Sequence, residues 1–305
     1  MSGTERRHGD VRRALRELFA DAGVSGLVHV ADVRRPEAAV TLGPDERVPI
    51  ASVYKVPLMA AFWRQVDAGV LDPRRAVTLD PSQRVAGPTG ISVLADPVTM
   101  SLRDLVVLMM TVSDNTAADA VLRAVGPAAV AQTCRALGLP DTHVHGGVAH
   151  TWDRLVAETG TGSLSAAMRH IASNDTAAPE DVYDPAHTSS STPADIARLL
   201  HAIWTDRAAS PAHCAFMREV MSRQPWRHRL ASGFPYDDVR VSGKTGTLGA
   251  LRHEAGVVEL PDGSTYTAVV FTRAARADAT LPRADAAIGT AARTAIESLR
   301  SHPPL

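Results

Sequence analysis

The chain has 305 residues, of which 21% are charged and 45% hydrophobic, a composition typical of a globular protein and not of a disordered or fibrous one. At roughly 150 residues per domain, this length indicates one large domain or two coupled lobes. The 32 basic residues balance 33 acidic ones to a formal charge of −1, which excludes nucleic-acid or membrane-surface binding through bulk positive charge.

The N-terminal part of the chain predicts one helix, a hairpin and a second helix. Residues 11–22 have the pattern of a short amphipathic helix and not of an apolar signal-peptide core. No apolar run reaches about 18 residues, so we expect no membrane span and a cytoplasmic protein. Residues 24–33 and 38–42 are β-rich runs around turn residues, which predicts a hairpin. Residues 52–68 then place apolar side chains on one helical face.

The middle of the chain is mainly helical in pattern. Ser101 and Asp104 resemble a capping box that opens a helix to about residue 110, and residues 115–125 predict another. Thr192 and Pro193 predict a helix start, with the helix running to about residue 204. Residues 144–191 are rich in small polar side chains, so we expect a loop-rich excursion with one helix near 163–172, beside the functional site.

Strand patterns return after residue 225. Residues 256–260 and 266–272 flank a Pro-Asp-Gly-Ser turn signal, and an Ala-rich helix is predicted over 283–300. Strands at both ends with helices between them predict an α/β protein. We expect one α/β lobe built from residues 1–50 and 213–305, with an all-helical lobe of residues 51–212 inserted and the site between them.

Lysine and cysteine are both rare in this chain. Lysine occurs only at Lys55 and Lys244, and arginine supplies every other basic position. Lysine differs from arginine because a desolvated amine can lose its proton, whereas a guanidinium effectively cannot. Cys134 and Cys214 lie in no metal-like spacing, which predicts two buried free thiols.

Ser52 and Lys55 are spaced for nucleophilic catalysis. They lie at i and i+3, on one face of the first turn of a predicted helix. A serine is a weak nucleophile and needs a base within hydrogen-bond reach, which Lys55 becomes if its pKa is depressed. Burial and a second cation lower a lysine pKa, and Lys244 is the only other lysine. The helix start would also stabilise negative charge developing at Ser52.

Two further triplets turn this spacing into a recognisable set. Ser113-Asp114-Asn115 follows an apolar helical run, and Lys244-Thr245-Gly246 follows a strand-like run at residues 239–241. SxxK, SDN and KTG in this order are the signature of class A β-lactamases and penicillin-binding proteins. From about residue 24 onward, the chain resembles a class A β-lactamase-related serine hydrolase. The resemblance implies an antiparallel sheet flanked by terminal helices, with an inserted helical lobe.

The resemblance also implies a role for each motif residue. Ser52 would be acylated, Lys55 would take its proton, and Ser113 would relay a proton to the leaving group. Lys244 would support the electrostatics, and Asn115 would bind the substrate amide. The backbone N–H groups of Ser52 and Thr247 would form the oxyanion hole. Substrate contacts on the KTG side would come from Thr245, Gly246, Thr247 and Arg252, the last as a second carboxylate contact; the alternative for Arg252 is a solvated strand arginine.

One feature of class A β-lactamases is missing from the chain. The family carries an omega-loop glutamate, in an ExxLN context, that activates the deacylating water, and ExxLN occurs nowhere here. The corresponding interval offers four carboxylates and four histidines as remote candidates: Glu158, Glu180, Asp181, Asp184, His143, His145, His150 and His187. We therefore expect acylation to be better supported than rapid β-lactam hydrolysis.

The sequence leaves two classes of function open. The first is a serine hydrolase or acyltransferase whose acyl-enzyme forms at Ser52 from a β-lactam, or from an ester or amide that carries a carboxylate. The second is a binding protein that acylates and then stalls. Either one acts on a small molecule and needs no metal or cofactor.

Overall fold

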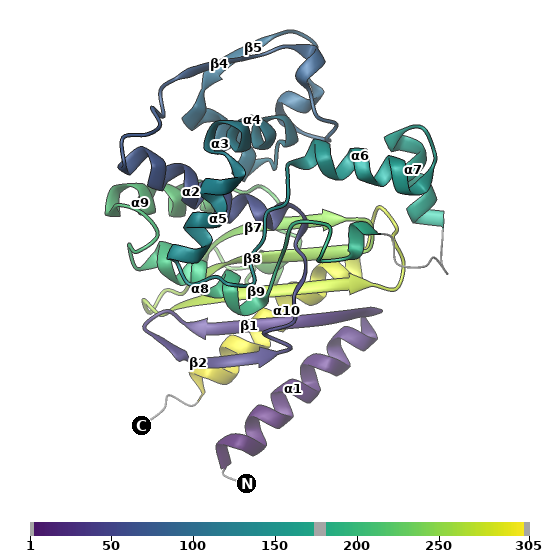
Figure 1. Cartoon of the computed structure of the whole chain (residues 1–305). Helices are drawn as coiled ribbons and strands as arrows, with labels where there is room; N and C mark the ends of the chain where they lie inside the picture. The colour runs from purple at the N-terminus through teal and green to yellow at the C-terminus, as the bar shows by residue number, and fades with distance from the viewer. Residues whose placement is uncertain (1–2, 174–180, 302–305) are drawn as a thin grey trace.

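The structure is a computed structural model that describes residues 3–173 and 181–301. Its centre is an antiparallel five-stranded sheet in the order β2-β1-β9-β8-β7. The strands are β1 (Val24–Asp32), β2 (Arg35–Leu42), β7 (Arg240–Leu248), β8 (Leu251–Glu259) and β9 (Thr265–Ala274). Strands from both ends of the chain therefore share one sheet, as the sequence predicts (Figure 1).

The two edges of this sheet differ from the predicted strand limits. β2 begins at Arg35 and includes Pro36, which an edge strand tolerates because its outer N–H groups need no partner. At the other edge, β7 continues through the KTG triplet to Leu248, whereas the sequence indicated only a short strand before it. The KTG residues therefore lie within the edge strand itself.

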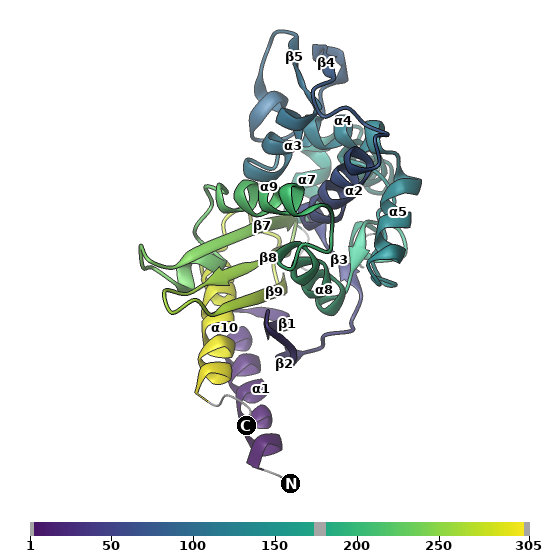
Figure 2. The same cartoon turned by 90° about the vertical axis from the view of Figure 1, so that its left-hand side faces the viewer.

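Helices from the two chain ends cover one face of the sheet. α1 (Gly3–Asp21) and α10 (Pro282–Arg300) pack side by side against β1 and β2, as Figure 2 shows. Leu15 and Phe19 of α1 and Ile288 of α10 are buried in this layer, together with Val28 and Val30 of β1. Alanines along α10 let it approach the strands closely, which explains why an Ala-rich segment forms a buried helix.

The other face carries the remaining helices and a larger apolar core. α8 (Pro193–Trp204) lies on β9 and β1, and α9 (Pro211–Ser222) packs against β7. Beyond them lie α2 (Lys55–Asp67), α3 (Leu102–Thr111), α4 (Asn115–Val125) and α5 (Pro127–Ala136). Two short strand pairs, β3 (Val48–Pro49) with β6 (Ser190–Ser191) and β4 (Ala76–Leu79) with β5 (Val98–Ser101), complete this side. The predicted lobe limits at residues 50 and 212 stay a prediction.

Capping residues confirm two of the predicted helix starts. Ser101 accepts a hydrogen bond from the Asp104 N–H (3.1 Å) at the start of α3, and Thr192 accepts one from the Asp195 N–H (3.0 Å) at the start of α8. The Asp104 carboxylate contacts the Ser101 hydroxyl (2.7 Å), because aspartate is one methylene shorter than the glutamate of a standard capping box.

The expectation of a loop-rich segment over residues 144–191 is wrong in part. The helix expected near residues 163–172 is confirmed as α7 (Leu164–Ser173), but a second helix that was not predicted, α6 (Val148–Thr159), precedes it. The short turn η4 (Asp181–Tyr183) follows later in the segment. α6 has no side-chain cap in its own sequence, since Gly147 precedes it. Asp119 of α4 accepts hydrogen bonds from the N–H groups of Val148 (2.7 Å) and Ala149 (3.0 Å) instead. A tertiary contact thus begins this helix, which a local sequence pattern does not reveal.

Both cysteines are buried free thiols, as predicted. Within residues 3–173 and 181–301, no helix combines the length and the apolar character that crossing a membrane requires.

Candidate active site

Ser52 lies in a 3₁₀ turn, η1 (Ala51–Tyr54), that leads directly into α2. Ala51 has a φ of 44°, a left-handed conformation that residues other than glycine rarely adopt. Ser113, in the SDN triplet, has a φ of 56°. Such strain persists only where the surrounding structure enforces it, and it gathers at functional sites. Pro57 falls in the first turn of α2, where its missing N–H breaks no helical hydrogen bond.

The Lys55 amine is fully buried and joins α2 to the SDN triplet. Its Nζ contacts the backbone oxygen of Ser113 (2.8 Å), Ser113 Oγ (3.2 Å) and Asn115 Oδ1 (3.0 Å). Burial lowers the Lys55 pKa to about 7, against the opposing effect of the nearby Asp114 and Asp119 carboxylates. A lysine with this pKa is about half neutral near pH 7 and can therefore act as a base there.

Lys244 approaches Ser113 from the opposite side. Its Nζ donates to Ser113 Oγ (2.9 Å) and to the backbone oxygen of Thr245 (2.9 Å). Burial, and then the neighbouring Lys55 charge, lower the Lys244 pKa well below its ordinary value. The two lysines of the chain therefore meet at one hydroxyl, and the Lys55 charge destabilises the charged form of Lys244.

No hydrogen bond joins Ser52 Oγ to Lys55 Nζ among the described residues. The lysine instead donates to the Ser113 and Asn115 oxygens within the same cluster. Apo sites often hold such pairs at longer range until substrate binds.

Edge strand β7 brings the KTG residues to Ser52. Gly246 has to be glycine here, because a Cβ would lie 2.7 Å from the backbone oxygen of Ile50. The Thr245 N–H donates to Gln224 Oε1 (2.8 Å), on the side of β7 away from β8. N–H groups two residues apart in a strand point the same way, so the Thr247 N–H also faces the open edge. That orientation suits an oxyanion-hole donor.

Arg229 is a site residue that the sequence analysis missed. This residue is 4% exposed, and its guanidinium donates to Thr247 Oγ1 (2.8 Å), Asp285 Oδ1 (2.7 Å) and the backbone oxygen of Gly246 (2.9 Å). It therefore supports the β7 edge directly beneath Thr247. Nothing in its local sequence separates Arg229 from the many other arginines of the chain.

Arg252 does line the cavity, but not as a solvated strand arginine. It is 3% exposed, and its guanidinium donates to the backbone oxygens of Gly249 (2.5 Å), Leu251 (3.0 Å) and Asp278 (2.6 Å). Because backbone oxygens accept hydrogen bonds from this guanidinium, the alternative prediction of a solvated strand arginine is wrong. Its contacts hold the turn after β7 against the segment that precedes α10.

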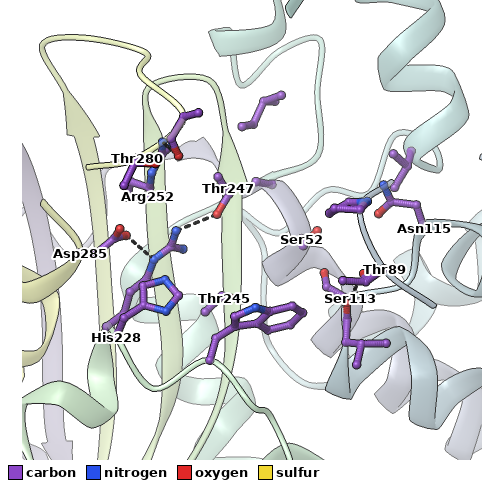
Figure 3. A pocket seen from close by; sticks show the side chains of 18 of the residues that line it. Ser52, Thr89, Ser113, Asn115, His228, Thr245, Thr247, Arg252, Thr280 and Asp285 are labelled. Carbon is purple, nitrogen blue, oxygen red and sulfur yellow. Dashed lines mark hydrogen bonds and ion pairs between the residues drawn. The ribbon is translucent and has the colours of Figure 1, made fainter. Parts of the chain in front are cut away.

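One cavity of about 680 Å³ is bordered by Ser52, Ser113, Asn115, Thr245 and Thr247. Figure 3 shows Ser52, Ser113 and Asn115 on one side, opposite the strand that carries Thr245 and Thr247. Arg252 and Asp285 lie at the far end of that strand side, with His228 nearby. Arg229, which is paired with Asp285, also lines the cavity. Trp226, His228, Trp152 and Met168 also line the cavity, and the sequence analysis did not identify them. All site residues predicted from the three motifs and from position 252 therefore lie in or directly behind one cavity.

The cavity lacks a free carboxylate among the residues that the structure describes. Asp285 lines it but is paired with Arg229. Glu158 pairs with Arg154 on α6 (3.4 Å), and Asp184 is about half exposed near His187, so neither lines the cavity. The same holds for His143, His145, His150 and His187. Glu180 and the Asp181 side chain lie outside the described part of the chain.

Comparisons with known proteins agree with this arrangement. A family model described as "Beta-lactamase enzyme family" matches residues 10–299. "Beta-lactamase regulatory protein BlaB" of Streptomyces cacaoi is 32% identical over 308 residues, covering 94% of this chain and 97% of that protein.

Two solved structures extend the likeness to the whole fold. A β-lactamase from Sphaerobacter thermophilus DSM 20745 has a TM-score of 0.77 at 25% identity, covering 96% of this chain and 98% of that one. An ancestral class A β-lactamase has a TM-score of 0.75 at 27% identity, covering 94% and 99%.

Proposed function

Because the chain belongs to the β-lactamase enzyme family, we propose that it forms an acyl-enzyme at Ser52 with a β-lactam, or with a related amide or ester that carries a carboxylate. One observation carries the proposal: two buried lysines of lowered pKa meet at Ser113 Oγ, at 3.2 Å and 2.9 Å, beside Ser52. A buried amine of this kind is a proton acceptor and not merely a fixed charge.

The proposed steps use only groups around the cavity. Ser52 Oγ bonds to the substrate carbonyl carbon as its proton moves to Lys55 Nζ. The N–H groups of Ser52 and Thr247 then receive the oxyanion. When the carbon–nitrogen bond breaks, the leaving nitrogen takes a proton through Ser113 Oγ, which both lysines contact. Asn115 binds the substrate amide, and the KTG strand with Arg229 holds its carboxylate.

Deacylation has no comparable support, and this favours a second candidate function. The carboxylate that lines the described cavity, Asp285, is paired with Arg229 (2.7 Å) and is not free to activate water. A protein that acylates and then holds its acyl group would act as a sensor or sink for β-lactams. The relative named as a β-lactamase regulatory protein is consistent with such a role.

The rate of nitrocefin opening separates the two candidates. We expect a pre-steady-state burst of about one equivalent per protein, followed by a slow steady rate, because an acyl-enzyme accumulates when its hydrolysis is slower than its formation. Stopped-flow absorbance measures both phases. Efficient turnover without a burst would contradict the expectation and direct attention to Glu180 and Asp181. A Glu158→Gln variant serves as the control, since Glu158 does not line the cavity.

Arg229 is expected to set affinity for the substrate carboxylate. An Arg229→Lys variant keeps a cation opposite Asp285 but loses the planar fork that reaches Thr247. We expect about a 10-fold rise in KM for benzylpenicillin, in line with the loss of one hydrogen bond to a charged group. The methyl ester of the same penicillin, which has no carboxylate, should change little. An equal change for both compounds would remove Arg229 from carboxylate binding.

A further inference from the structure

α6 is held against the catalytic cluster by two tertiary contacts. Its first N–H groups, at Val148 and Ala149, donate to the buried Asp119 carboxylate of α4. Gly147 passes so close to Asp119 that a Cβ would lie 2.3 Å from Oδ1. Any side chain at position 147 would therefore have to displace this carboxylate. The start of α6 is therefore placed rigidly relative to the helix that Asn115 opens.

Trp152 of α6 shares a hydrogen-bond acceptor with Asn115. The indole Nε1–H donates to the backbone oxygen of Ala86 (3.0 Å), and Asn115 Nδ2 donates to the same oxygen (2.8 Å). Asn115 Oδ1 in turn contacts Lys55 Nζ (3.0 Å). The indole of Trp152 and the side-chain amide proposed to bind the substrate are therefore linked through a single backbone carbonyl group. Trp152 also lines the cavity.

The cavity is apolar on this side and charged at the other. Trp152 and Met168 pack with Leu248 in a cluster that joins α6 and α7 to the end of β7, and all three border the cavity together with Val148. The charged side chains that border it, Arg229, Arg252 and Asp285, come from the sheet side and from α10, and His228 lies beside them. Figure 3 shows His228, Arg252 and Asp285 on this side. This arrangement suits a molecule with a carboxylate at one end and an uncharged apolar group at the other.

We propose that Trp152 and the wall formed by Val148, Trp152, Met168 and Leu248 select substrates whose acyl side chain is apolar and preferably aromatic. The inference rests on the proposed acylation of Ser52 and names the substrate class of that site. A flat acyl group gains by contact with the indole face. A charged acyl group would lose its hydration against this wall without gaining a partner.

The test uses penicillins that differ only in the acyl side chain: phenylacetyl, acetyl and α-carboxyphenylacetyl. We expect second-order acylation rate constants, measured by intact mass, at least about 10-fold higher for the phenylacetyl compound than for the other two. Trp152→Ala should remove most of this preference, because it should slow acylation by the phenylacetyl compound more than acylation by the acetyl compound. Trp152→Phe, which keeps an aromatic face but loses the bond to Ala86, should retain most of it.

The outcomes separate a selective wall from a merely structural one. If Trp152 only braces Asn115, all three penicillins slow equally in both variants, and the inference is wrong. Equal rates for the phenylacetyl and acetyl compounds in the parent chain would also overturn it, with the proposed function intact. Tyr236→Ala is the matched control, because this tyrosine is exposed and does not line the cavity.

If no penicillin acylates the protein, the proposed function is wrong. A binding measurement then still tests the role of Trp152. In a Ser52→Ala background, calorimetry with N-phenylacetylglycine and N-acetylglycine reports on the wall alone. We expect the phenylacetyl compound to bind about 10-fold more tightly, and the difference to disappear on adding Trp152→Ala. Equal affinities would overturn the inference independently of any chemical step.

Discussion

A Ser52→Ala variant is expected to take up no covalent adduct from a β-lactam or a fluorophosphonate probe, whereas the parent chain gains about one equivalent. Ser52 is the hydroxyl that lies in the turn leading into α2, three residues before the buried Lys55, and it borders the same cavity as Thr245 and Thr247 of β7. Ser113 also lines the cavity, but its Oγ is already shared between two lysines. Intact-mass spectrometry and peptide mapping measure both the extent and the position of labelling.

The control for this experiment is Ser82→Ala, an exposed serine outside the cavity, which should label as the parent does. Labelling that persists in Ser52→Ala at the same peptide would transfer the nucleophile to another residue. Loss of labelling in both variants would point to a general defect in folding, which a thermal melt detects.

Replacing Lys55 with arginine is expected to slow acylation by about 100-fold or more. Arginine keeps the positive charge but cannot release its proton to act as a base. Lys244→Arg is the matched comparison, because Lys244 is also buried and also contacts Ser113 Oγ, yet its proposed role is electrostatic. We expect a smaller loss there. Near-normal acylation in Lys55→Arg would remove Lys55 from proton transfer.

The pH dependence of acylation provides a second readout for Lys55. The pKa of this lysine is lowered to about 7, and only the deprotonated amine accepts the Ser52 proton. The acylation rate constant should therefore rise with pH through about 7 and level off above it. In Lys55→Arg this rise should disappear, and in Lys244→Arg it should remain. A flat profile in the parent chain would contradict the base assignment.

Much of the fold was predictable because it depends on local signals. The helix starts at Ser101 and Thr192 carry their own side-chain caps, and the strands at both chain ends alternate or run apolar as buried strands do. α6 was not predicted, since its capping group, Asp119, lies 29 residues earlier in the chain. A helix whose first N–H groups are satisfied from elsewhere has no local signature.

In the candidate active site too, some features follow from local sequence and others depend on tertiary contacts. Sequence alone indicated the family and predicted Ser52 as the nucleophile and Lys55 as its base, with Lys244 as a second cation, because the SxxK, SDN and KTG spacings and the rarity of lysine are properties of the chain itself. Only the tertiary structure decided that both amines meet at Ser113 Oγ and that Arg229 supports the β7 edge at Thr247. It also decided that residues of α6 and α7 border the cavity. The physical reason is that pKa, burial and cavity shape arise from contacts between segments distant in sequence, and a motif specifies residue types without specifying what surrounds them.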